Sequence, residues 1–103
     1  MKIVIYCVNY HSYNSLIDYL CSIDKAMAAG ENKISLSVFV ADNSCPLEPF
    51  SYTPTRFSLQ IVPTRKNLGY FGAISFLMER YSPLDYDYSI ISNVDVLLKE
   101  DSL

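Results

Sequence analysis

Four short polar clusters in this chain carry side chains suited to ligand binding, and each follows an apolar run typical of a buried strand. In an open parallel α/β sheet, ligands bind in the crevice outside the carboxyl ends of the strands. Amide and carboxylate groups gathered there could bind a nucleoside, and an acidic residue could hold a metal ion. The four clusters are Val8-Asn9-Tyr10-His11, Asp42-Asn43-Ser44, Asn67-Leu68-Gly69 and Asn93-Val94-Asp95.

The segments around these clusters predict one α/β domain over residues 1–103. Apolar runs rich in β-branched residues favour strands at about residues 2–8, 34–41, 57–62 and 86–92. Apolar side chains at three- and four-residue spacing predict one helix before the second strand and another before the fourth. Because strands alternate with helices, we expect three layers and a mainly parallel sheet with right-handed crossovers.

Capping residues mark the ends of the two expected helices. Ser12 or Asn14 can cap the first helix, whose apolar face includes Tyr13. Gly30 follows its last turn and is expected in the left-handed conformation that often ends a helix. Asn67 can cap the second helix in the same way as Ser12.

Taken singly, each cluster has a structural interpretation beside the functional one. Asp42 could accept the imide N–H of a pyrimidine or could stabilise its own loop. Asn67 and Gly69 could simply start a helix, or could bring its N-terminal amides to a diphosphate. Asn93 and Asp95 share one side of an extended segment. Asp95 could hold Mg²⁺ or Mn²⁺, or be a solvated strand end.

Three further polar residues have structural interpretations. His11 is expected at the surface or in packing, because a lone histidine is more often that than a ligand. Asp85 and Asp87 precede the fourth strand, at the edge of the sheet opposite the clusters, and are expected to face solvent.

The joint order of the clusters resembles the amino-terminal half of a family 2 inverting glycosyltransferase with the GT-A fold. Within that family, the chain is most similar to the rhamnosyltransferase-like branch, whose metal motif reads Asn-Pro-Asp. The resemblance spans nearly the whole chain. It is carried by Ile5-Tyr6-Cys7-Val8-Asn9-Tyr10, Val40-Ala41-Asp42-Asn43-Ser44, Asn67-Leu68-Gly69-Tyr70-Phe71-Gly72 and Ser92-Asn93-Val94-Asp95-Val96.

The resemblance implies a Rossmann-like half-fold that binds a nucleotide-diphosphate sugar, with dTDP-rhamnose suggested by the branch. Asn9 and Tyr10 would line the base pocket, and Asp42 would read the base. Asn67 and Gly69 would lie near the ribose and diphosphate. The acceptor would be a glycan or a lipid-linked glycan, in the synthesis of a polysaccharide or a cell-surface glycan.

At the fourth cluster, the resemblance implies that Asp95 binds a divalent metal together with the nucleotide-sugar. Asn93 would stand where other members have the first acidic residue of the motif. The sequence departs from the family pattern at four places. Val94 replaces the usual proline, His11 replaces a common asparagine, Cys45-Pro46 replaces a polar continuation of the Asp42 loop, and Ser75 stands where relatives often have an asparagine.

The acceptor-binding half of the family lies beyond Leu103, and so does its catalytic base. An inverting transfer needs a base to deprotonate the acceptor hydroxyl. We therefore expect this chain to be the donor-binding part, without transferase activity of its own. A non-catalytic nucleotide-sugar-binding module, or a structural α/β module that pairs with a partner, stays open as an alternative.

Composition limits the partners. The net charge is −3 and no Lys/Arg patch is present, which argues against nucleic acid. Three widely spaced cysteines are expected as reduced thiols, typical of a cytoplasmic protein, and no apolar stretch is long enough to span a membrane. Only 18% of residues are charged and the fourth strand is apolar, so we expect self-association through an exposed sheet edge.

Two other α/β classes are excluded by the first cluster. A receiver domain needs an acidic pair after the first strand, where this chain has Cys7-Val8-Asn9. A dinucleotide-binding domain needs the G-x-G-x-x-G turn at the same place.

Overall fold

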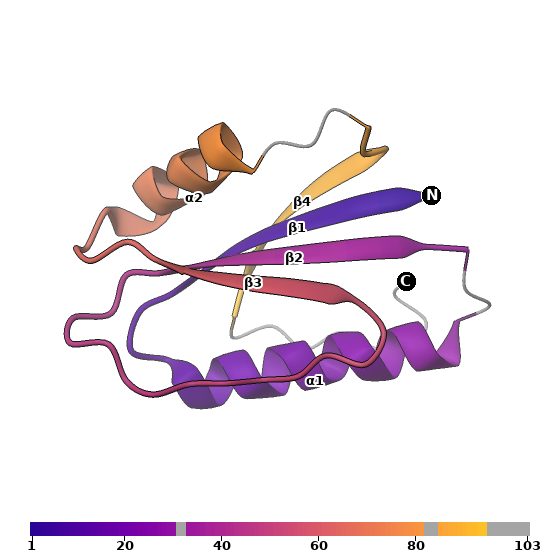
Figure 1. Cartoon of the computed structure of the whole chain (residues 1–103), viewed down its shortest axis with the longest axis horizontal. Coiled ribbons are helices and arrows are strands. Elements are labelled where there is room, and N and C mark those ends of the chain that lie inside the picture. Colours follow the sequence, from indigo (N-terminus) through magenta and orange to yellow (C-terminus); the bar gives the residue numbers. More distant parts are fainter. Residues whose placement is uncertain (31–32, 82–84, 95–103) are drawn as a thin grey trace.

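The four strands form a single, entirely parallel sheet in a computed structural model that describes residues 1–30, 33–81 and 85–94 (Figure 1). The order across the sheet is β3-β2-β1-β4, so the first strand is internal. The expected α/β class and parallel sheet are confirmed. The strands are β1 (Lys2–Asn9), β2 (Ser35–Asp42), β3 (Ser58–Pro63) and β4 (Tyr88–Asn93).

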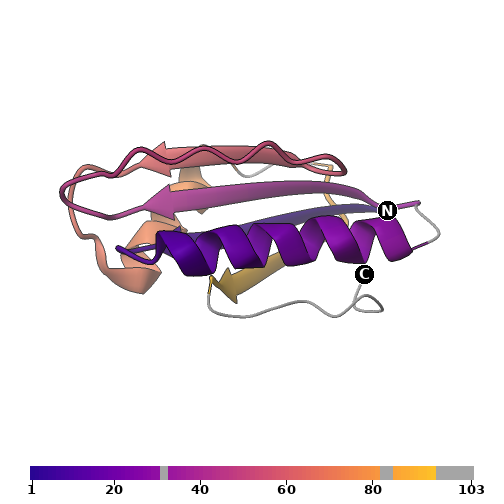
Figure 2. The same ribbon diagram turned by 90° about the horizontal axis from the view of Figure 1, so that it is seen from below.

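In the described ranges, two helices cover opposite faces of the sheet: α1 (Tyr13–Ala29) and α2 (Gly69–Arg80). Seen from below, α1 runs along the near face and α2 lies behind the sheet (Figure 2). Successive side chains of β1 alternate between the two faces. Ile5 therefore packs in the core under α1, whereas Tyr6 packs in the core under α2.

The α1 face holds the larger of the two cores. Fully buried Leu16, Leu20 and Ile23 of α1 pack there against the strands. Cys7 belongs to the same core, and burial raises the pKa of its thiol to about 12. It is therefore a packing residue and not a nucleophile at neutral pH.

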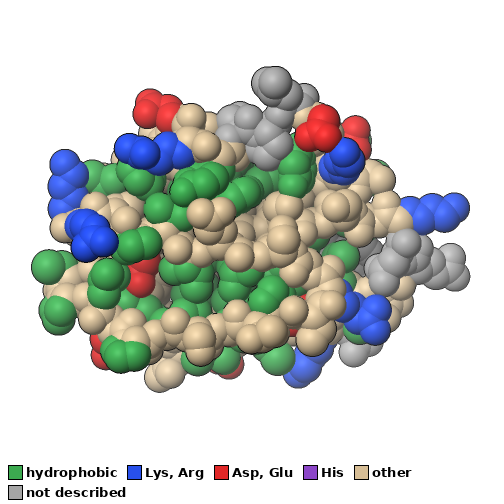
Figure 3. All heavy atoms as spheres, in the orientation of Figure 1, with side chains coloured by type: hydrophobic (Ala, Val, Ile, Leu, Met, Phe, Trp, Pro, Cys, Tyr) green, Lys and Arg blue, Asp and Glu red, His purple; other side chains and the backbone are tan. Residues whose placement is uncertain are grey.

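In the orientation of Figure 1, hydrophobic side chains form two bands, and lysines and arginines are scattered around the rim (Figure 3).

The order of the strands creates a switch point between β1 and β4. From β1 the chain proceeds through α1 to β2 and then to β3, moving in one direction across the sheet. After β3 the chain crosses back through α2, and β4 then pairs with the other side of β1. In open α/β sheets, the crevice at such a reversal is the usual ligand site.

The loop between β2 and β3 is fastened to α1 by a carboxylate. Asp24 Oδ2 accepts the hydroxyl of Tyr52 at 2.5 Å, and Asp24 Oδ1 accepts the backbone N–H groups of Thr55 (3.1 Å) and Arg56 (3.0 Å). This fastening keeps the connection on the α1 side of the sheet.

The helix ends differ from their expected capping. Gly30 has φ −83° and ψ 159°, so the left-handed conformation predicted for it is wrong: the chain leaves α1 in an extended direction. The Ser12 side chain makes no capping bond; instead Asn9 Oδ1 accepts the Ser12 N–H at 3.0 Å. Asn67 lies one residue before the cap position, and its Oδ1 accepts the Gly69 N–H at 2.9 Å.

At the amino edge of the sheet, two aspartates bind Lys2. Asp85 forms an ion pair with the Lys2 ammonium at 2.7 Å, and Asp87 Oδ2 accepts the Lys2 backbone N–H at 2.8 Å. Both aspartates are exposed, as expected, and their bonds to Lys2 also fasten the start of β4 to β1. Among the described residues, no helix has the length and apolar character needed to cross a membrane.

Candidate functional site

A crevice of about 510 Å³ lies at the carboxyl ends of β1 and β4, beside the start of α2. This is the switch point of the sheet, and the volume is in the range of small-molecule sites. Four of the predicted site residues line it together. The described lining residues are Val8, Tyr10, Ser12, Asn43, Asn67, Gly69, Tyr70, Asn93 and Val94.

The start of α2 faces this crevice through Gly69 and Tyr70. Gly69 has φ +72°, a conformation that glycine adopts without strain, and the Asn67 side chain holds its N–H. The first turn of α2 contains no acidic residue. A helix N-terminus of this kind carries partial positive charge, so it favours an anionic group in the crevice.

Asn9 and Asp42, by contrast, are buried directly behind the lining, at 0% and 4% exposure. Asn9 Nδ2 donates to Asp42 Oδ1 at 3.3 Å, and the Ser44 N–H donates to the same oxygen at 3.0 Å. The Tyr13 hydroxyl donates to Asp42 Oδ2 at 2.7 Å. The carboxylate thus joins three segments of this chain, and its contact with a base stays a prediction.

Asn43 connects the buried network to the crevice. Its backbone N–H donates to the Asn9 carbonyl at 2.9 Å, and its Nδ2 donates to the Gly69 carbonyl at 3.3 Å. Its Oδ1 accepts the Thr64 hydroxyl at 2.5 Å. Asn43 therefore ties β1, β3 and α2 together at the site. Asn43 was not predicted as a site residue, although its place in the second polar cluster could have indicated it. Thr64 was not predicted either.

Two aromatic residues line the crevice, the exposed Tyr10 and the half-buried Tyr70. Tyr10 is 52% exposed and packs edge-on against His11, with 4.6 Å between ring centroids. On the α2 side, Tyr70 lines the crevice and lies 5.4 Å from Phe71, which is 81% exposed. Such rings offer flat apolar surfaces to a planar or sugar ring.

The described lining of the crevice is uncharged. It offers amide, hydroxyl and backbone groups, and no group of three acidic, histidine or cysteine side chains that could hold a metal occurs in residues 1–30, 33–81 and 85–94. These residues do not form a metal site by themselves. Asp95, the predicted metal ligand, lies outside the described residues.

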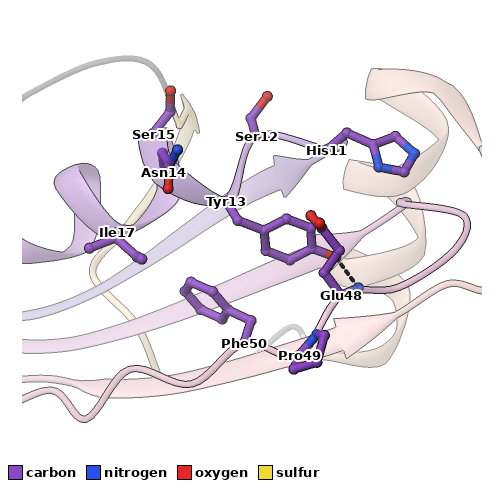
Figure 4. A pocket seen from close by; sticks show the side chains of 9 residues that line it. All are labelled: His11, Ser12, Tyr13, Asn14, Ser15, Ile17, Glu48, Pro49 and Phe50. Atoms are coloured by element: carbon purple, nitrogen blue, oxygen red, sulfur yellow. Dashed lines mark hydrogen bonds between the residues drawn. The ribbon is translucent and has the colours of Figure 1, made fainter.

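A second cavity, of about 640 Å³, lies between the start of α1 and the loop that follows β2 (Figure 4). His11 lines this cavity, and its backbone has a positive φ of 53°. Its N–H donates to Ser44 Oγ at 2.8 Å, and its Nε2 accepts the Cys45 N–H at 3.3 Å. His11 therefore holds the loop after β2, in keeping with the structural interpretation given to it.

Comparison with models of known protein families gives no match, and a search of curated proteins finds no relative of this chain. The class of protein is therefore defined by its fold and by the crevice. The part of the chain that the structure describes is a small α/β unit with a four-stranded parallel sheet and two helices, consistent with a Rossmann-like half-domain.

Proposed function

We propose that this chain binds a nucleotide-diphosphate sugar in the crevice between β1, β4 and α2, as the donor-binding part of a glycosyltransferase. One observation carries the proposal: Tyr10, Asn67, Gly69 and Asn93, chosen from strand ends in the sequence, line one cavity at the switch point. In this arrangement the base stacks on Tyr10 and the diphosphate lies at the start of α2.

The donor in this proposal is a pyrimidine nucleotide-sugar such as dTDP-rhamnose, and the acceptor is a glycan or a lipid-linked glycan. Because the described crevice lining is uncharged, the diphosphate charge calls for a divalent cation, Mg²⁺ or Mn²⁺, with Asp95 as its protein ligand. The three free cysteines favour a reducing compartment, and we place the protein in the cytoplasm.

Sugar transfer by this chain alone is not part of the proposal. The described lining offers no carboxylate or imidazole to act as the base of an inverting reaction. A non-catalytic nucleotide-sugar-binding module with the same crevice is the alternative. Transfer of sugar to an added acceptor by the isolated chain would exclude that alternative.

Calorimetric titration with dTDP, UDP and ADP, each with Mg²⁺, tests the proposal, and a matched glycine pair locates the site. Gly69→Ala is expected to destabilise the fold by about 1 kcal/mol, because alanine is strained at φ +72°, and to weaken nucleotide binding. Gly72→Ala is the control, since the new Cβ would meet only the Cβ of Leu68, the cap residue of α2, at an ordinary contact distance of 3.4 Å. It is expected to leave binding unchanged. Equal affinity in both variants would place the nucleotide elsewhere.

We also propose that the outer edge of β4 pairs with a second copy of the chain. Ile90 and Ile91 are 37% and 52% exposed on opposite faces of this strand. In the described part of the chain, no strand pairs with that edge, and unpaired apolar edges promote association.

Sedimentation analysis tests the pairing. Ile91→Lys is expected to shift the chain from dimer to monomer, because a charged edge residue opposes strand pairing. Ile17→Lys, on α1 and 42% exposed, is the control and should leave the dimer intact. A wild-type chain that stays monomeric at high concentration would contradict the proposal.

A further inference from the structure

The Tyr13 hydroxyl joins the end of β2 to the β2–β3 loop, although Tyr13 is not among the residues that line the crevice. It donates to Asp42 Oδ2 at 2.7 Å and accepts the Glu48 backbone N–H at 3.2 Å. Figure 4 shows the second bond and the ring of Tyr13 beside that of Phe50, with 5.6 Å between their centroids. The ring is thus held by packing while its hydroxyl acts as a connector.

The bond to Asp42 is the shortest of the three that this carboxylate accepts. The other two come from Asn9 Nδ2 (3.3 Å) and the Ser44 N–H (3.0 Å). Hydrogen bonds to an ionised acceptor are shorter and stronger than neutral ones. Asp42 is 4% exposed, so water offers little replacement for a lost donor.

The network continues from Asp42 into the crevice lining. Asn9, which bonds to Asp42, also accepts the Asn43 N–H through its carbonyl at 2.9 Å. Asn43 lines the crevice and bonds to the Gly69 carbonyl at 3.3 Å. Hydrogen bonds therefore connect Tyr13 to the crevice residue by residue, through Asp42, Asn9 and Asn43.

From this geometry we infer that Tyr13 is a positioning residue of the nucleotide site. Its hydroxyl holds Asp42, and Asp42 holds the ends of β1 and β2 in the arrangement that shapes the crevice. In this view Asp42 acts mainly as an internal acceptor. The inference rests on the proposed function, which supplies the ligand whose affinity reports the positioning.

The chain contains a matched control for this bond. Tyr52 donates its hydroxyl to Asp24 Oδ2 at 2.5 Å, at the other end of the β2–β3 loop. Tyr13→Phe and Tyr52→Phe thus each remove one phenol–carboxylate hydrogen bond that α1 makes, and Tyr13→Phe also removes the acceptor of the Glu48 N–H. Neither phenol lines the crevice, so a difference between the two variants reports on the connection to the crevice.

Calorimetric titration with dTDP and Mg²⁺ is the main measurement. Tyr13→Phe is expected to raise the dissociation constant about tenfold, the scale of one charge-assisted hydrogen bond. Tyr52→Phe is expected to leave the dissociation constant unchanged. It should also lose less thermal stability than Tyr13→Phe, because Asp24 is partly exposed to water whereas Asp42 is buried. The inference would be overturned if Tyr13→Phe bound the nucleotide as tightly as the wild type, or if both variants lost the same amount of nucleotide affinity.

Amide hydrogen exchange gives a second readout that needs no ligand. In Tyr13→Phe, the amides of Asn43, Ser44 and Glu48 should exchange several-fold faster, and in Tyr52→Phe they should not. If the wild type binds no nucleotide, the proposed function fails, and this exchange pattern alone decides the inference. Unchanged exchange at all three amides in Tyr13→Phe would then overturn it.

Discussion

Replacement of Asp42 by alanine is expected to lower the free energy of unfolding by about 3 kcal/mol. The side chain is 4% exposed and accepts bonds from Asn9, Tyr13 and Ser44. Alanine leaves three donors without an acceptor, and each buried unsatisfied donor costs about 1–3 kcal/mol, reduced where a group can turn to water. Urea unfolding measures this loss. The proposed nucleotide binding should weaken at the same time, because the crevice loses its internal support.

Asp24→Ala is the control for this prediction. Asp24 also accepts donors from three residues, Tyr52, Thr55 and Arg56, but at the far end of the loop and partly exposed to water. We expect a loss of about 1 kcal/mol, since the freed donors can reach solvent, and unchanged nucleotide affinity. An Asp42→Ala chain as stable as Asp24→Ala would contradict the hub role given to Asp42.

The strands were predictable because their signal is local. Runs such as Ile3 to Val8 are apolar on both faces, and the observed strands begin and end within two residues of the expected ranges. β4 begins at Tyr88 and not at residue 86, because the Asp87 side chain binds the Lys2 backbone just before the ladder starts. That contact joins residues far apart in the sequence, so no local pattern indicates it.

The candidate site was predictable only in part, for a similar reason. The ends of parallel strands meet at one edge, which is enough to bring Tyr10, Asn67 and Asn93 into one crevice. Helical periodicity places the Tyr13 ring in an apolar face, and that ring does pack against Phe50. Periodicity does not indicate that its hydroxyl would find Asp42, because hydrogen-bond partners are chosen by the tertiary arrangement.

Asn9→Asp is the variant with the largest expected effect at neutral pH. Asn9 is fully buried, and its Nδ2 lies 3.3 Å from Asp42 Oδ1. Aspartate has nearly the same shape but replaces this donor with a second carboxylate. Two carboxylates that share a buried site cannot both ionise, and such pairs typically separate by about 3 pKa units. At about 1.4 kcal/mol per unit, the expected destabilisation at pH 7 is about 4 kcal/mol.

The pH dependence of Asn9→Asp separates this repulsion from simple loss of a hydrogen bond. In the unfolded chain both carboxyls ionise above about pH 4, whereas the folded pair retains one proton to higher pH. Because the folded variant then binds more protons, its stability falls as the pH rises from about 4 to 7. Asn9→Ala loses the same donor without adding a charge, so its deficit should not grow over that range. Urea unfolding of both variants at pH 4.5 and pH 7 measures the difference, and equal deficits at the two pH values in Asn9→Asp would show that Asp42 and residue 9 are not a closed, buried pair.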